Sequence, residues 1–151
     1  MAAFRRPARF ANIRAMGQRV ASVEVAASAG FMAPLHAHGA DEAVHVVEGS
    51  LTVYAGDETM QVSPGETFVV REGVLHTYRV DAPARSVFTT LTASGSGYES
   101  FLRATGPVAP DGAWSTDEDA ATVAALAAAA DIDLFGPPGL LPPAGERAHA
   151  A

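Results

Sequence analysis

The amino-acid sequence predicts an all-β domain that is followed by a short helical segment. Between residues 20 and 92, apolar residues alternate with polar ones in short runs, which is typical of strands with one buried face. Glycine and proline turns separate these runs at regular intervals. The clearest apolar repeat with helical spacing comes only after residue 116. Many short strands joined by regular turns indicate an antiparallel sandwich or barrel.

The order of the elements follows from this pattern. We expect strands at residues 20–25, 43–47, 51–55, 60–62, 67–70, 75–80 and 87–92. A helix should begin after Thr116, which is a plausible N-cap with Asp119 three residues on, and should end at Gly136. Its apolar stripe is Val123, Leu126, Ala130 and Leu134. This stripe could lid the barrel mouth, but we expect it to cover the outer sheet and support a dimer, with Trp114 as an anchor in that packing.

The chain of 151 residues is most simply one domain with extensions. We predict a flexible N-terminal arm at residues 1–12, the barrel at 13–95, a helical extension packed on the barrel at 96–136 and a flexible tail at 137–151. Within the extension, residues 98–104 suit a second, shorter helix.

Composition excludes several classes of function. The formal net charge is −7 and the basic residues are ten scattered arginines, so neither nucleic acid nor an anionic membrane is the expected partner. The absence of cysteine excludes disulfides and thiolate chemistry. No apolar run is long enough for a signal peptide or a membrane-spanning helix. We therefore expect a cytoplasmic protein whose partner is a small-molecule substrate.

Four residues carry the functional prediction, namely His36, His38, Glu42 and His76. On a strand, His36 and His38 point to the same face, and Glu42 returns to that face four residues later. His76 must come from another strand, which a barrel would place opposite. Three imidazoles and a carboxylate form a natural ligand set for a divalent metal, and a metal with an incomplete protein shell keeps positions open for chemistry.

The same alternation predicts a pocket wall. Residues that share an inward face with the four ligands, or lie at the barrel entrance, are Val44, Val46, Tyr78, Val80, Phe68, Val70 and Met32. Such a lining is apolar with one phenol, and plain barrel core is the alternative use for each residue. His45 should face outward. Arg71 should lie near the mouth, where it meets an anionic group or pairs with Glu66 or Glu72.

These residues resemble the two motifs of the cupin superfamily. Gly30, His36, His38, Glu42 and Gly49 match every fixed position of the first motif, and Gly65, Gly73 and His76 match the second. Arg71 stands where proline is usual and Val80 where asparagine is usual. The resemblance implies a double-stranded β-helix with the metal held inside by His36, His38, Glu42 and His76. It favours Fe²⁺, Mn²⁺ or Ni²⁺, with Co²⁺ or Zn²⁺ also compatible, and a homodimer.

The segment after the barrel is similar to the C-terminal extension of bacterial single-domain cupins described as quercetin 2,3-dioxygenase-like. The similarity rests on residues 98–103, Gly106-Pro107 and 134–138. The similarity points to a subfamily, but it is not evidence that the substrate is a flavonol.

Three functions fit these observations. The first is a metal-dependent dioxygenase acting on a small aromatic or enol-bearing compound, with Glu42 as a ligand, a base or both. The second is a metal-dependent isomerase, cyclase or lyase without a redox step. The third is a non-catalytic cupin that binds a ligand and leaves it unchanged.

Overall fold

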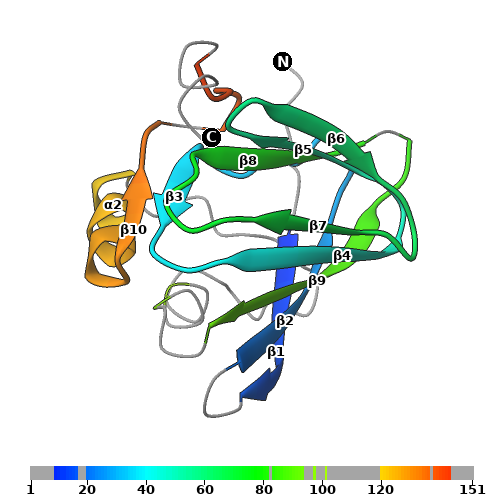
Figure 1. Ribbon diagram of the computed structural model, residues 1–151, viewed down its shortest axis with the longest axis horizontal. Coiled ribbons are helices and arrows are strands. Elements are labelled where there is room, and N and C mark those ends of the chain that lie inside the picture. Colours follow the sequence, from blue (N-terminus) through cyan, green and yellow to red (C-terminus); the bar gives the residue numbers. More distant parts are fainter. Residues whose placement is uncertain are drawn as a thin grey trace, which may run out of the picture.

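Two antiparallel five-stranded sheets face each other in the computed structural model, which describes residues 9–16, 20–81, 83–93, 97, 101, 120–136 and 138–143 (Figure 1). The first sheet has the order β1-β2-β9-β4-β7 and the second β10-β3-β8-β5-β6. The strands are β1 (Arg9–Met16), β2 (Val20–Ala27), β3 (His36–His38), β4 (Glu42–Glu48), β5 (Leu51–Ala55), β6 (Glu58–Val62), β7 (Thr67–Val70), β8 (His76–Val80), β9 (Ser86–Ala93) and β10 (Ile132–Leu134). This double-stranded β-helix, with a helix after it, confirms the predicted fold class.

The core lies between the two sheets and follows the predicted alternation. Along β5, Leu51, Val53 and Ala55 are buried while the residues between them are partly exposed. Each fully buried leucine or valine side chain contributes about 1.5–3 kcal/mol relative to an exposed one. A one-residue slip of any such strand would turn its apolar side chains to solvent, so burial also fixes the register that positions the site.

The first strand begins earlier than the sequence suggests. Residues 9–12, which we assigned to the N-terminal arm, belong to β1, whose register with β2 starts at Arg9 opposite Ala27. The arm boundary at residue 12 is therefore wrong. Pairing with β1 satisfies the backbone groups on one side of β2, a tertiary requirement that leaves little trace in a local sequence pattern. Residues 1–8 lie outside the described part.

The C-terminal extension also differs from the prediction. Helix α2 (Ala120–Ala129) ends before Leu134, and Asp131 has a positive φ of 60° that turns the chain into β10. Aspartate tolerates this left-handed conformation better than most residues. Leu134 therefore belongs to a strand that pairs with β3, and not to the stripe of the helix.

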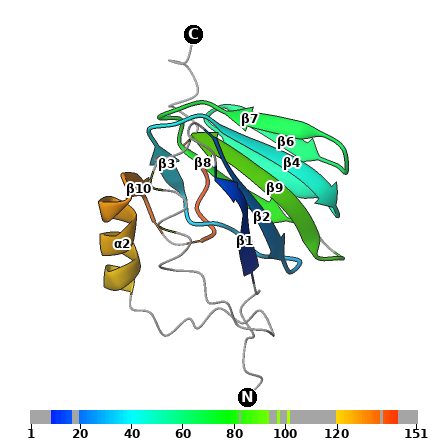
Figure 2. The same ribbon diagram turned by 90° about the horizontal axis from the view of Figure 1, so that it is seen from below.

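The helix and β10 lie together at one end of the barrel in both views (Figures 1 and 2). Ala127, Ala130 and Ile132 are buried in the same cluster as the barrel core. The predicted N-cap Thr116, the anchor Trp114 and most of the expected helix at 98–104 lie outside the described residues. Among the described helices, none has the length and apolar character needed to cross a lipid bilayer.

Candidate metal centre

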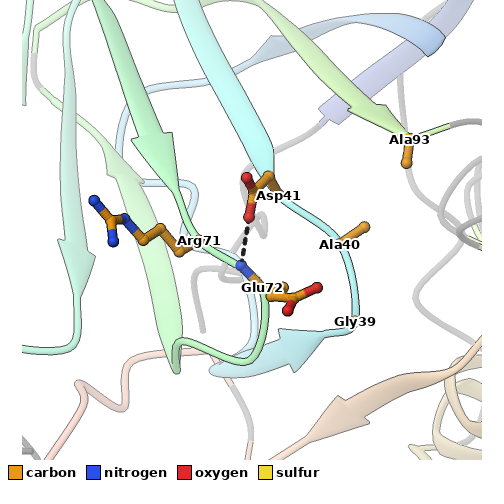
Figure 3. A pocket seen from close by; sticks show the side chains of 6 residues that line it. All are labelled: Gly39, Ala40, Asp41, Arg71, Glu72 and Ala93. Atoms are coloured by element: carbon orange, nitrogen blue, oxygen red, sulfur yellow. Dashed lines mark hydrogen bonds between the residues drawn. The ribbon is translucent and has the colours of Figure 1, made fainter. Parts of the chain in front are cut away.

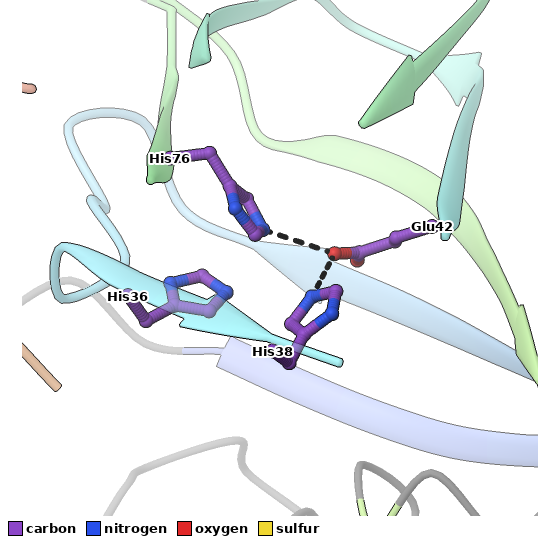
Figure 4. Close-up of side chains that lie close together, drawn as sticks. All are labelled: His36, His38, Glu42 and His76. Carbon is purple, nitrogen blue, oxygen red and sulfur yellow. Dashed lines mark hydrogen bonds and ion pairs between the residues drawn. The ribbon is translucent and has the colours of Figure 1, made fainter. Parts of the chain in front are cut away.

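Three strand ends bring the four predicted ligands together (Figure 4). Strand β3 carries His36 and His38, β4 begins at Glu42, and β8 begins at His76. His36 is the register partner of His76, so two ligands from distant parts of the sequence face each other across one strand pair. One side-chain nitrogen or oxygen from each residue lies within 4.8 Å of the others, and all four side chains are buried.

Each imidazole is oriented by a backbone carbonyl. His36 Nδ1 lies 2.8 Å from the Pro34 oxygen, His38 Nδ1 2.9 Å from the Ala40 oxygen, and His76 Nδ1 2.7 Å from the Val74 oxygen. A carbonyl can only accept, so Nδ1 of each ring must carry the proton and donate it. In the neutral ring, this leaves the lone pair on Nε2, as is usual for metal-binding histidines.

The Nε2 atoms of two rings point at the same carboxylate oxygen. Glu42 Oε2 lies 3.0 Å from Nε2 of His38 and 3.2 Å from Nε2 of His76. Two neutral rings would direct lone pairs at a negative oxygen, which is repulsive in a buried place. The arrangement therefore requires positive charge among these atoms, either as a proton on an imidazole or as a cation.

The electrostatics of the cluster agree with this requirement. Burial lowers the pKa of His36 to about 3, so this ring is neutral and its lone pair is available. Burial also lowers the pKa of His38, but the hydrogen bond and the charge of Glu42 outweigh it and raise that pKa above its usual value. Burial raises the pKa of Glu42, but hydrogen bonds from His38 and His76 outweigh it, so its pKa falls well below the usual range and the group is ionised.

These residues fit a divalent metal. Three imidazole nitrogens with fixed orientation and one ionised carboxylate suit several transition ions, and four protein ligands leave positions open on an ion that prefers six. The donor set does not select among Fe²⁺, Mn²⁺, Co²⁺, Ni²⁺ and Zn²⁺. The cluster could thus hold a metal ion whose identity the structure leaves open.

The predicted pocket residues lie on the interior of the barrel. Val44, Val46, Phe68, Val70, Tyr78 and Val80 are all buried in the core cluster, and Met32 is half-buried. The Tyr78 ring contacts Phe88 at 5.1 Å between centroids in an edge-to-face arrangement. Their inward position agrees with a pocket wall, but exposures of 0–5% for the six buried residues are equally those of plain core, so their use in binding a substrate stays a prediction.

Two further predictions concern residues outside the cluster. His45 faces away from the four ligands, and its Nδ1 lies 2.9 Å from Thr67 Oγ1 on the outer side of the sheet, as predicted. The predicted pairing of Arg71 is wrong for both carboxylates, because none of the ion pairs in the described part of the chain includes its guanidinium. Glu66 instead accepts a hydrogen bond from the Ser63 N–H.

Arg71 lines a depression of about 710 Å³ beside the loop that joins β3 to β4 (Figure 3). Asp41 accepts a hydrogen bond of 2.8 Å from the Glu72 N–H, and the Gly73 N–H donates to the His38 carbonyl at 2.8 Å. These bonds tie the loop between His38 and Glu42 to the loop that leads to His76. The remaining lining residues are Gly39, Ala40 and Ala93.

Sequence reasoning missed the groups that orient the imidazoles. Pro34, Ala40 and Val74 act through backbone carbonyls, which every residue type carries, so no side-chain pattern could reveal them. It also missed β10, which pairs with β3 and sets Ile132 opposite His38. A three-residue strand is too short to show a period, so only the fold reveals it.

Comparison with known proteins agrees with this architecture. Residues 23–91, which include all four cluster residues, match the family model described as "Cupin domain". No protein of curated function matches the chain by sequence.

Three solved structures illustrate the similarity of fold. KdgF from Halomonas sp. is 24% identical with a TM-score of 0.52, covering 62% of this chain and 83% of that one. An uncharacterized protein with a double-stranded beta-helix domain from Klebsiella pneumoniae is 16% identical with a TM-score of 0.52, covering 62% and 76%. A cupin-superfamily sugar phosphate isomerase from Silicibacter pomeroyi is 20% identical with a TM-score of 0.52, covering 57% and 59%. At these identities the likeness concerns the fold alone.

Proposed function

We propose, from the cupin domain matched by residues 23–91, that this protein is a metal-dependent oxygenase acting on a small aromatic or enol-bearing compound. One observation carries the proposal. Three imidazoles, each with Nδ1 committed to a backbone carbonyl, converge with an ionised carboxylate inside an apolar barrel. This arrangement is preorganised for a divalent ion and has no evident use in stabilising the fold, because a buried carboxylate beside imidazole lone pairs is costly.

When bound, a redox-active divalent ion such as Fe²⁺, Mn²⁺ or Ni²⁺ supplies Lewis acidity and single-electron chemistry at its open positions. His36, His38 and His76 hold the ion through Nε2, with their rings fixed from the Nδ1 side.

Glu42 has a second role in this proposal. In the metal-free cluster, hydrogen bonds from His38 and His76 outweigh burial and lower its pKa, so the carboxylate is ionised but is a weak base. Once the two Nε2 atoms bind an ion, these hydrogen bonds are lost and a carboxylate oxygen is free to accept a proton. A substrate hydroxyl that reaches the cluster would give its proton to a Glu42 oxygen, which raises the electron density of the substrate. Loss of the proton from an enol or phenol is the activation that attack on dioxygen needs.

The apolar interior supports the choice of substrate class. Val44, Val70 and Phe68 cover the first sheet beside the cluster, and Tyr78 and Val80 cover the second. Such walls exclude water and favour a flat or apolar organic molecule over a sugar or a free ion.

The test begins with elemental analysis of the purified protein, followed by oxygen-uptake assays with phenolic and enolic compounds after loading with each of the five ions. We expect uptake with at least one compound and one redox-active ion. His76→Ala should abolish it, whereas His45→Ala, which removes an outward-facing imidazole three residues from Glu42, should not. Turnover of the same compound without oxygen, or with Zn²⁺ alone, would replace the oxygenase proposal by a Lewis-acid isomerisation, cyclisation or elimination.

A further inference from the structure

One buried hydroxyl inside the barrel has no partner. Thr90 is 1% exposed, and its Oγ1 is the side-chain atom that lacks a hydrogen bond among the buried groups of the described residues. The neighbouring inward-facing threonine differs, because Thr92 Oγ1 lies 3.2 Å from the Asp41 carbonyl and donates to it.

The strand register places Thr90 in the barrel interior, two residues along β9 from the position that lies opposite Glu42 of the metal centre. On β9 the inward side chains are Ser86, Phe88, Thr90 and Thr92. Thr92 is the register partner of Glu42, and Thr90 is the partner of Val44. Two residues along a strand correspond to about 6.6 Å, so the Thr90 side chain lies about that far from the layer of the carboxylate.

The layer beyond Thr90 is aromatic. Phe88, two residues further along the same inward face, contacts the Tyr78 ring, and Tyr78 is two residues from the ligand His76. A ligand that extends inward from the metal centre would therefore pass Thr90 before it meets these rings. His36 is 9% exposed, the most accessible of the four residues, so it marks the side of the cluster nearest the solvent.

Burying the Thr90 hydroxyl without a hydrogen-bond partner lowers the stability of the free protein. A valine would occupy the same space without burying a polar group, and the register neighbours Val23 and Val44 show that this layer is otherwise apolar. Buried polar groups in folded proteins are nearly always paired, so an unpaired one needs an explanation, such as a functional role or a bound water or ion.

We propose that the Thr90 hydroxyl is a substrate-binding group, and that the substrate carries two oxygen functions. One oxygen is held at the metal centre and the second hydrogen-bonds to Thr90 Oγ1, with the carbon skeleton against the apolar wall. The inference rests on the proposed function, since it concerns the same site, and it narrows the substrate class from any enol or phenol to compounds with two separated oxygens.

The test uses zinc-loaded protein, so that binding is measured without redox turnover. The probes are catechol, resorcinol and hydroquinone, with phenol as the one-oxygen control, and calorimetry gives each Kd. The variant is Thr90→Val, which removes only the hydroxyl. The matched control is Thr89→Val, the adjacent threonine on the outward side of the same strand.

We expect at least one dihydroxybenzene to bind the wild-type protein more tightly than phenol, and Thr90→Val to weaken that probe about fivefold while leaving phenol unchanged. Thr89→Val should change neither. Thermal melting of Thr90→Val should be equal to or higher than that of the wild type, because an unpaired buried hydroxyl is removed.

Three results would overturn the inference. They are equal Kd values for Thr90→Val and the wild type, no preference of the wild type for any dihydroxybenzene over phenol, and a clear drop in melting temperature, which would show that the hydroxyl already has a structural partner. Failure of the oxygenase proposal is separate, because it is read from oxygen uptake. A Thr90-dependent preference without oxygen uptake would keep this inference and remove the oxygenase.

Discussion

His38 and Glu42 meet through Nε2 and Oε2 at 3.0 Å, while Nδ1 of the same imidazole donates to the Ala40 carbonyl. Both ring nitrogens thus face acceptors, which a neutral imidazole cannot satisfy. The hydrogen bond and charge of Glu42, acting against burial, raise the pKa of His38 accordingly. A metal ion would take the place of the proton between the same two residues, so the predictions on metal binding begin from this contact.

Removing one imidazole should remove the metal. His76→Ala deletes a ligand that no neighbouring side chain replaces in the cluster, so we expect metal affinity to fall by about 100-fold or more. Circular dichroism should still report a folded barrel. His45→Ala should retain wild-type metal content in elemental analysis, and normal metal content in His76→Ala would exclude His76 as a ligand.

Metal affinity should decrease in acid. Histidines bind metal only when neutral, so protons compete below about pH 6.5. The raised pKa of His38 means that this ring takes up a proton at higher pH than His36, because burial lowers the pKa of His36 to about 3. Occupancy measured after equilibration at pH 8, 7, 6 and 5 should fall through this series. Equal occupancy at pH 5 and pH 8 would contradict an imidazole site.

Gly49 should be intolerant of any side chain. Its φ is +82°, and an added Cβ would meet Ser86 Oγ and lie 2.6 Å from the Arg85 carbonyl oxygen. Gly65 has a similar φ of +87° but no atom within 4 Å of an added Cβ. Gly65→Ala should therefore cost only backbone strain, about 1–2 kcal/mol. Gly49→Ala should cost about 1–3 kcal/mol more through the steric clash.

Urea denaturation of the two glycine variants separates the two effects. If both variants lose the same free energy of unfolding, the close approach of Gly49 to the Arg85–Ser86 backbone does not contribute to the cost of adding a side chain at Gly49.

Asp81 should stabilise the fold at neutral pH and lose that effect in acid. Burial raises its pKa, but hydrogen bonds of 2.8 Å from both Thr52 Oγ1 and Ser50 Oγ, with weaker contacts to Gln61 and Arg79, outweigh burial and lower it. A lowered folded-state pKa means that the contribution is complete above the unfolded value near 3.8 and disappears as pH falls through the lower folded value.

The comparison is between wild type and Asp81→Asn in denaturant titrations at several pH values. The variant should be less stable at pH 7, and the difference should shrink below about pH 4. If the stability difference between wild type and Asp81→Asn grew in acid, the pKa of Asp81 would have to be raised by folding and not lowered.

The C-terminal strand should support the metal centre. Ile132 is buried and is the register partner of His38, and β3 otherwise pairs with β8 through His36 and His76 alone. Ile132→Ala should cost about 2–5 kcal/mol and also weaken metal binding, because β3 loses the packing that fixes its position. Val62→Ala, a buried substitution in β6 at the opposite edge of the same sheet, should destabilise the fold without a matching loss of metal affinity.

Equal metal affinity in the two variants after correction for the folded fraction would show that β10 acts only on stability.

Local patterns in the sequence predicted much of this protein. Alternation along residues 51–55 requires one buried face, and the same rule placed His36 and His38 on one side of a strand because side chains two residues apart share that side. Burial of an apolar face fixes register, so these predictions depend on neighbours along the chain and need no knowledge of distant partners. The rule of alternation fails for Glu42, because residues 39–41 leave the strand and Glu42 begins β4 in the other sheet, so only the fold brings it to the two histidines.

Other features depend on contacts between distant segments. Asp131 ends the helix and β10 forms because the edge of β3 accepts a partner, although residues 130–134 by themselves continue an apolar helical spacing. The pairing of β1 with β2 has the same origin.

Residue order alone was enough to predict the all-β class and the inward side chains, because both follow from a period of two, and to name the four candidate donors, because these follow from residue type. The convergence of those donors depends on how β3, β4 and β8 are placed in the two sheets. Backbone carbonyls of Pro34, Ala40 and Val74 fix the rings, and the sheet register sets His36 opposite His76. The physical reason is that carbonyls are common to every residue, so their use as hydrogen-bond acceptors depends on position in space and leaves no mark in the order of side chains.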